Sequence, residues 1–221
     1  DHAIDYITIS TTGDAKDFGD ITDGFNGHGT FHVSDNTRGV VGGGNHSPLP
    51  YNNNIEFMTI ATTGNSNDFG DLTNPMYGVN AAGSPTRGVI SAGDMSPSSN
   101  FYQYITIQSG GNAVRFGDAS QLNSGGGSVS NAVRGVFTVT TGSTPVIEFV
   151  TIATTSSATN FGDLDSGVSG SSSTRRFQCG ACSLTRGLFA GGYMNSDNTY
   201  APLNRIDYIT IATTGSSQDF G

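Results

Sequence analysis

The sequence contains no tryptophan, one lysine (Lys16) and two cysteines (Cys179 and Cys182), and only 12% of its 221 residues are charged. Two cysteines are too few for a small fold that depends on many disulfides. The formal net charge of −9 argues against a nucleic-acid-binding surface. No apolar run approaches the ~20 residues of a membrane-spanning helix, and no basic-then-apolar start indicates a signal peptide. The sequence therefore disfavours nucleic acids and membranes as partners.

The residues that are abundant indicate a β-rich chain with many turns. There are 32 glycines, 13 phenylalanines and 8 tyrosines, together with many isoleucines and valines. Aromatic and β-branched residues favour strands, and glycine favours turns. Low charge with much glycine, serine, threonine and asparagine is typical of extracellular or virion proteins. We therefore expect a virion or extracellular location.

One apolar phrase recurs five times along the chain. Its copies start at Ile4, Ile55, Tyr102, Ile147 and Ile206, at steps of 51, 47, 45 and 59 residues. A phrase Phe-Gly-Asp follows four of the copies, with its aspartates at Asp20, Asp71, Asp118 and Asp163, and the fifth copy stops at Phe220-Gly221. A third phrase, Arg-Gly before two apolar residues, starts at Arg38, Arg87, Arg134 and Arg186. Self-similarity at this period indicates a repeat architecture.

Each repeat is predicted to form about four short antiparallel strands. The first precedes Arg-Gly (Thr30–Val33, or Tyr77–Val79), the second carries Arg-Gly, the third is the apolar phrase, and the fourth enters Phe-Gly-Asp. The apolar phrase has apolar residues on both faces, as a strand buried on both sides requires. These features predict an all-β fold, a β-propeller whose blades span 45–59 residues.

The strand count leaves the ring incomplete. We interpret residues 1–221 as one propeller domain with a partial unit at 1–20 and further units at 21–71, 72–118, 119–163 and 164–221. This gives about four and a half blades. Three explanations fit: a five-bladed ring with one short blade, an excerpt of a longer array, or a half-blade that pairs with a neighbouring chain. The start at Asp1 instead of methionine favours a processed chain or an excerpt.

The pattern resembles kelch repeats, although the tryptophan of a kelch blade is absent and the phenylalanines of Phe-Gly-Asp are expected to fill its volume. More closely, Thr59–Leu72, Thr210–Phe220 and Thr185–Gly192 are similar to repeats of virion structural proteins from cyanophages and other marine tailed phages. The resemblance implies a role in a tail fibre, a baseplate or head decoration. It implies virion proteins, a further copy or a host-surface glycan as partners.

Features that occur once per repeat are interpreted as scaffold. We expect Arg38, Arg87, Arg134 and Arg186 to pair with the repeat carboxylates Asp20, Asp71, Asp118 and Asp163. The acidic position of the third strand, held by Asp5, Glu56, Gln103, Glu148 and Asp207, is expected to form hydrogen bonds between blades, the alternative being a ring of carboxylates for a cation.

The loops that differ between repeats are the candidates for recognition. The longest, Tyr193–Arg205, carries Tyr193, Met194, Tyr200 and Arg205, which we predict as ligand-binding residues. The Cys179–Cys182 pair is interpreted as buried small residues or a local disulfide. The histidine pair His28 and His32 is too weak a pattern to predict a metal site, and no cofactor is expected.

These observations predict a non-catalytic virion propeller that binds a host-surface glycan or a protein, with weak sites reinforced by avidity. One alternative is a purely structural, self-assembling fibre module. The other is a propeller enzyme acting on glycans, sialidase-like or galactose-oxidase-like. A glycosidase needs a non-repeating carboxylate pair and a copper site needs clustered histidines, whereas all four histidines lie in the first 46 residues. We therefore predict no catalytic residues.

Overall fold

The computed structural model describes residues 2–22, 29–45, 51–95, 100–140, 146–165, 174–196 and 199–221, which form only strands, turns and irregular segments. This confirms the expected all-β class. In the part of the chain so described, no helix has the length and apolarity needed to cross a membrane.

The repeats form a series of antiparallel sheets. A half-unit contains β1 (Ala3–Tyr6) and β2 (Lys16–Asp20). The first unit contains β3 (Thr30–Ser34), β4 (Arg38–Gly43), β5 (Asn52–Thr59) and β6 (Asn67–Tyr77), with β9 (Asp94–Met95) on the edge of β6. The second unit contains β7 (Ala81–Gly83), β8 (Arg87–Ile90), β10 (Phe101–Thr106) and β11 (Val114–Asp118).

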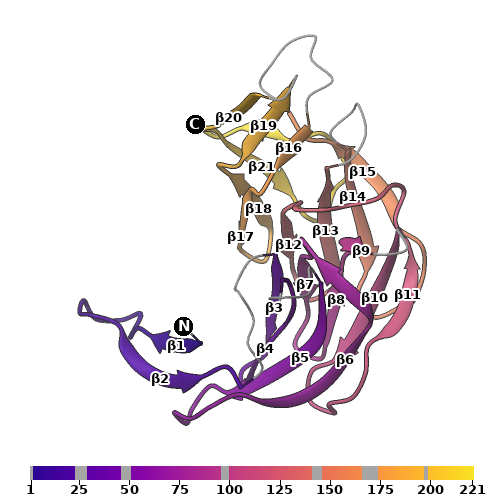
Figure 1. Cartoon of the computed structure of the whole chain (residues 1–221). Helices are drawn as coiled ribbons and strands as arrows, with labels where there is room; N and C mark the ends of the chain where they lie inside the picture. Colours follow the sequence, from indigo (N-terminus) through magenta and orange to yellow (C-terminus); the bar gives the residue numbers. More distant parts are fainter. Residues whose placement is uncertain are drawn as a thin grey trace.

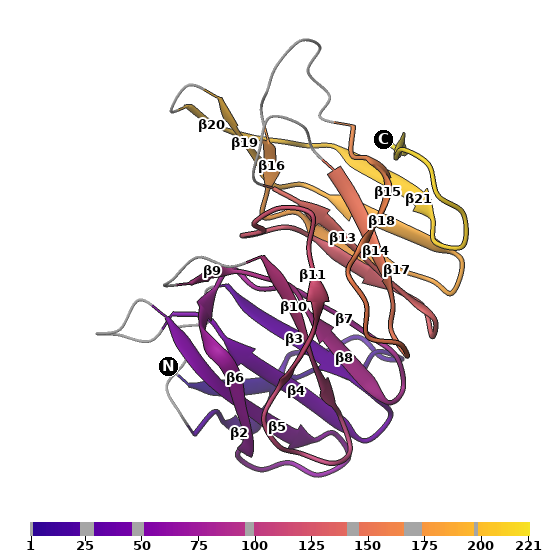
Figure 2. The ribbon, with the colours of Figure 1, turned by 90° about the vertical axis from the view of Figure 1, so that its right-hand side faces the viewer.

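The remaining sheets come from the C-terminal half. The third unit contains β12 (Ser128–Ser130), β13 (Arg134–Val139), β14 (Val146–Thr151) and β15 (Thr159–Asp163). The fourth contains β17 (Cys179–Cys182), β18 (Arg186–Ala190), β21 (Ile206–Thr210) and β22 (Gln218–Asp219). A separate sheet of β16 (Thr174–Arg176), β19 (Tyr193–Ser196) and β20 (Thr199–Pro202) is built from insertions beside the fourth unit, as Figure 2 shows.

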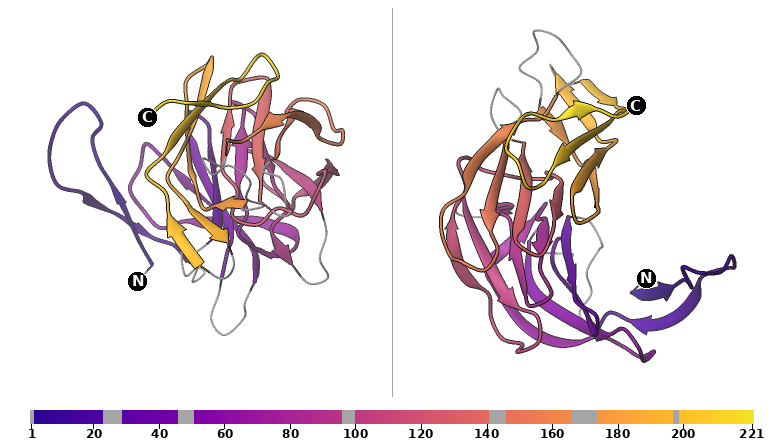
Figure 3. Two further views of the ribbon diagram at one scale, coloured as in Figure 1. Left: turned by 90° about the horizontal axis from the view of Figure 1, so that it is seen from above. Right: turned by 180° about the vertical axis from the view of Figure 1, so that it is seen from behind.

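The sheets follow one another around an open arc (Figure 1). The first strands of the four complete units, β3, β7, β12 and β17, lie next to each other along its inner side. The half-unit and the fourth unit stand at the two ends, with the N-terminus at one and the C-terminus at the other (Figure 3). Over the described residues the ring is therefore not closed.

The core consists of three apolar layers, each between two successive sheets. Val40 and Ile55 of the first unit pack with Ile105 and Ile107 of the second. The next layer holds Ala82, Tyr102, Val150 and Ile152, and the last holds Val136, Ile147, Ile209 and Ile211. The third strands of the second and third units, β10 and β14, thus bury one face against the preceding unit and the other against the following unit, as their two apolar faces predicted.

The Phe-Gly-Asp phrase forms the same β-bulge in the half-unit and the first three units. The register shifts there, so that the phenylalanine has no opposite residue in the third strand. Its ring packs edge-on against the aromatic residue of that strand at 6.0–6.2 Å in all five copies, the fourth unit included. The glycine must lack a side chain, because a Cβ on Gly70 would overlap the backbone of Gly111 in the next unit.

One detail of the strand assignment differs from the sequence-based expectation, and one turn recurs that the sequence analysis did not predict. The first strand of the second unit is Ala81–Gly83, and not Tyr77–Val79, because β6 continues to Tyr77 and pairs there with β9. In addition, a side-chain oxygen three residues before each repeat arginine accepts hydrogen bonds from the arginine N–H and the N–H before it; these residues are Asp35, Ser84, Asn131 and Ser183. This turn fixes the start of every Arg-Gly strand.

Candidate functional site at the open ends of the arc

The repeat arginines connect each unit to the next one. The guanidinium of Arg87 lies 4.2 Å from the centre of the Tyr104 ring in its own unit. It donates to the carbonyls of Ile152 and Ala153 in the third unit, at 3.1 and 3.0 Å. Arg38 and Arg134 make the same contacts to the following units. A cation with several donors thus joins one aromatic ring and two main-chain oxygens.

The expected pairing of these arginines with the repeat aspartates is wrong. Among the described ion pairs, none joins Arg38, Arg87, Arg134 or Arg186 to Asp20, Asp71, Asp118 or Asp163. The carbonyls at the end of the next third strand lie within reach of the guanidinium and need donors. The aspartates act through their main chain instead, since their carbonyl oxygens accept hydrogen bonds from the next unit at 2.7–2.9 Å, from Ser66, Ala113, Ala158 and Ser217.

A second backbone contact accompanies this one. The carbonyl oxygens of Phe18, Phe69 and Phe161 each accept a hydrogen bond of 2.7 Å from a glycine of the following unit: Gly64, Gly111 and Gly215. Together with the aspartate carbonyls, these bonds attach the outer strand of each unit to the loop between the third and fourth strands of its successor.

The acidic position of the third strand makes the hydrogen bonds between units that the sequence predicted. Glu56 accepts from the Thr22 N–H at 3.2 Å and from its hydroxyl at 2.9 Å. Glu148 accepts from the Ser120 N–H at 3.0 Å and from the Tyr102 hydroxyl at 2.6 Å. Burial of Tyr102, together with the Glu148 carboxylate, raises the pKa of the phenol well above its ordinary value.

The N-terminal end of the arc exposes the face that such a contact would cover. Ile7 and Ile9 are 66% and 96% exposed, whereas their counterparts Ile105 and Ile107 are buried against the first unit. Asp5, at the acidic position, is also exposed. The half-unit therefore presents one half of the repeated contact without its partner.

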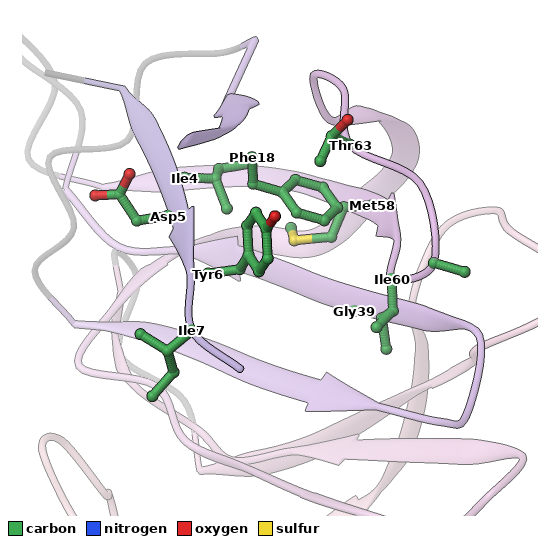
Figure 4. A pocket seen from close by; sticks show the side chains of 10 residues that line it. Ile4, Asp5, Tyr6, Ile7, Phe18, Gly39, Met58, Ile60 and Thr63 are labelled. Atoms are coloured by element: carbon green, nitrogen blue, oxygen red, sulfur yellow. The ribbon is translucent and has the colours of Figure 1, made fainter. Parts of the chain in front are cut away.

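On the other side of β1, between the half-unit and the first unit, lies a largely apolar cleft of about 400 Å³. Figure 4 shows the rings of Tyr6 and Phe18 and the side chain of Met58 converging there, with Asp5 and Ile7 on the opposite side of the strand. Gly39, Ile60 and Ala61 complete this wall. Ile60 is 47% exposed, although its counterparts in the later units are buried.

The C-terminal end exposes the complementary half. The guanidinium of Arg186 lies over the Tyr208 ring at 4.8 Å and is exposed, with no hydrogen bond to another described residue. Phe220 is 53% exposed, whereas Phe69, Phe116 and Phe161 are buried by a following unit. Ala181 is exposed, although the residues at its position in the inner strands, Val33, Ala82 and Val129, are buried.

The predicted ligand-binding residues are placed as follows. Met194 is buried, and the Tyr193 ring stacks on Phe177 at 5.5 Å. Arg205 pairs with Asp207 at 2.8 Å and with Asp165 at 2.6 Å, and the hydrogen bond to Asp207 raises its pKa. Tyr200 lies in β20, but its side chain is outside the description. The structure thus buries Met194 in the inserted sheet and pairs Arg205 with two carboxylates, and ligand binding at this loop stays a prediction.

A buried charge cluster that sequence reasoning missed fastens the inserted sheet to the fourth unit. Arg175 of β16 forms an ion pair with Asp207, and both side chains are fully buried. Its remaining donors reach the carbonyls of Phe189, Gly191 and Arg205 at 2.8–3.1 Å. The available signal was the pair Arg175-Arg176 in a chain with nine basic residues. A buried guanidinium that makes four hydrogen bonds to groups of the same chain indicates a structural role.

The cysteine expectation is wrong: Cys179 and Cys182 are free and exposed. Cys179 lies on the outer face of β17, the face that no following unit covers within the described chain. Of the histidines, His32 is exposed and lies 3.2 Å from the Thr30 hydroxyl, whereas His28 lies outside the described residues. No group of three or more metal-ligating side chains occurs within the described segments.

Comparison of the sequence with protein-family models and with curated proteins gives no match. The contacts between the internal repeats therefore indicate which contacts are missing at each open end.

Proposed function

We propose that this chain is a non-catalytic structural module of a virion, with propeller-like blades, whose two open ends join one copy to the next. The observation that carries the proposal is that the same arginine contact forms three times inside the chain and is left half-made at each end. The resemblance to phage virion repeats supports the setting.

The joint follows from the internal contacts. Arg186 of one copy would donate to the carbonyls of Ile9 and Ser10 in the next, as Arg134 does to Ile211 and Ala212. The N–H of Gly13 would donate to the carbonyl of Phe220 in the other copy, as the N–H of Gly215 donates to the carbonyl of Phe161. A Cβ built on Gly221 would meet nothing within 4 Å in one copy, whereas a Cβ on its internal counterparts Gly19, Gly70, Gly117 or Gly162 would overlap the backbone of the following unit.

The apolar surface at the ends gives the joint its driving force. Burial of a whole isoleucine side chain stabilises by roughly 1.5–3 kcal/mol, and Ile7 and Ile9 are both largely exposed. Association costs at least about 4 kcal/mol in lost translational and rotational freedom. The two terms are comparable, so the assembly is expected to depend on protein concentration.

Self-assembly has more structural support than recognition of a host-surface glycan or protein by the loop at 193–205. Of the four side chains predicted for that recognition, Met194 is buried in the inserted sheet and Arg205 is paired with Asp165 and Asp207.

The test is the native mass by light scattering over a range of concentrations. We expect multiples of 22.8 kDa that increase with concentration and return to one copy in Ile9→Asp. Val133→Asp is the matched control, since Val133 is 59% exposed in a unit that has both neighbours. A monomer at every concentration, or equal effects of the two substitutions, would contradict the proposal.

A further inference from the structure

The strand β1 lacks a partner that every other third strand has. Strands β5, β10, β14 and β21 each pair on one side with an Arg-Gly strand, namely β4, β8, β13 and β18. Each pairs on the other side with the fourth strand of its unit. Within the described residues, β1 pairs only with β2. Its other edge therefore presents backbone donors and acceptors without a strand to bind them.

The cleft beside this edge has the acceptors that an arginine uses elsewhere in the chain. Tyr6 occupies the position of Tyr104, over which Arg87 lies. Ile60 and Ala61 occupy the positions of Ile152 and Ala153, whose carbonyls accept from Arg87. All three line the cleft (Figure 4). One cleft is thus lined by the aromatic residue and by the two residues whose counterparts bind Arg87 between the second and third units.

The wall of the cleft also has room for the strand that precedes Arg-Gly. Gly88, Gly135 and Gly187 each lie against an inner-strand side chain of the preceding unit, namely Val33, Ala82 and Val129. At the corresponding Gly39, a Cβ would meet only the side chain of Met58. The first unit therefore has space at Gly39 for a small apolar side chain from the inner strand of a preceding unit.

We propose that this cleft and the open edge of β1 bind an Arg-Gly β-hairpin from another polypeptide segment, which completes the half-unit as a four-stranded sheet. The strand edge requires a partner with a backbone in extended conformation, and the ring with two carbonyls requires a cation with several planar donors, which is a guanidinium. The four hairpins of this type in the chain are already paired within their own units. The occupant is therefore a fifth such hairpin, of the same repeat type.

The probe for this site is a fluorescent peptide with the sequence of residues 80–93, which contains the β7–β8 hairpin and Arg87. Binding is measured by fluorescence polarisation, and its location by hydrogen exchange of the backbone amides at residues 3–7. The protein is the Ile9→Asp variant, so that the outcome does not depend on the proposed joining of copies, which uses the opposite face of β1.

We expect saturable binding with protection of the β1 amides, and a dissociation constant at least about tenfold higher for the peptide carrying Arg87→Ala. Tyr6→Phe should bind as the parent does, because Phe57 and Phe149 serve at this position in other units. Tyr6→Leu should weaken binding to a similar extent as the peptide substitution. Absence of saturable binding, indifference to the arginine, or protection away from β1 would each overturn the inference.

Discussion

Replacing the repeat arginine by alanine in an internal unit and in the last unit measures what the arginine contact between units contributes to stability. Every other effect of the substitution is shared by the two variants. Arg87 and Arg186 follow the same serine turn, precede the same glycine and lie over a tyrosine ring of their own sheet. They differ in one respect: Arg87 donates to two carbonyls of the following unit, and Arg186 has no following unit. Arg87→Ala and Arg186→Ala are therefore a matched pair.

The expected magnitudes follow from these contacts. A cation over an exposed ring contributes about 0.5–1 kcal/mol, and both substitutions lose it. A hydrogen bond to a charged group contributes about 1.5–3 kcal/mol, and half-burial of Arg87 reduces each of its two bonds to about 1–1.5 kcal/mol through solvent screening. Arg87→Ala should therefore destabilise by roughly 2–4 kcal/mol and Arg186→Ala by at most about 1 kcal/mol.

Thermal unfolding followed by circular dichroism measures the difference. For a chain of this length, 1 kcal/mol shifts Tm by about 2–4 °C, so Arg87→Ala should lower Tm by roughly 4–16 °C and Arg186→Ala by no more than about 4 °C. The samples are kept dilute, so that association of the ends does not contribute. Equal shifts for the two variants, or an unchanged Tm for Arg87→Ala, would refute the structural role of the internal arginines.

Two further predictions concern charged groups. Arg175→Met removes the buried ion-pair partner of Asp207 and should destabilise the protein by about 3–5 kcal/mol in denaturant unfolding. The control Arg115→Ala removes an exposed ion pair with Asp118 and should cost less than about 1 kcal/mol. Similar costs for the two substitutions would contradict the burial argument. Although desolvation alone would raise it, hydrogen bonds from Gln108, Thr37 and Arg38 hold the pKa of Asp35 at about 2, below the ordinary 3.8. Because the folded-state pKa is the lower one, this stabilisation is present above pH ~4 and is lost as pH falls through ~2. Asp35→Asn should flatten stability over that window, and an unchanged acid limb would show that the turn does not depend on the charge.

The local structure of each repeat could be predicted because its signals are local. Four strands, turns at the polar clusters and a third strand buried on both faces all follow from the order of apolar and turn residues. Tyr102 and Ile105 illustrate this, since they are buried in different layers on the two faces of one strand.

Contacts between units were harder to infer, since they depend on which atoms meet after folding. The repeated phrases contain four arginines and four aspartates, and pairing these opposite charges was chemically reasonable. The structure places the guanidinium of Arg38 beside the carbonyls of Ile107 and Gln108 instead. Main-chain carbonyls occur at every residue and leave no mark in a sequence, so this partner could not be predicted.

Position in the array also changes the environment of a residue without changing its type. Ala82 and Ala181 stand at the same position of the first strand, yet Ala82 is buried and Ala181 is exposed. Cys179 is exposed for the same reason, since its counterpart in the first unit, Phe31, is buried. A repeat pattern predicts the average environment of its positions and fails at the ends.

The two ends of the described arc carry the surfaces that the proposed joining of copies would use. Repeat proteins that remain monomeric carry terminal repeats with a polar outer face, which takes the place of the missing neighbour. Here the terminal faces keep the apolar residues of the internal repeats: Ile9 is 96% exposed at one end and Phe220 is 53% exposed at the other. Each carries the half of the contact that the other lacks, because both derive from one repeated sequence. A surface that is apolar and complementary to another surface of the same molecule favours heterologous, head-to-tail association.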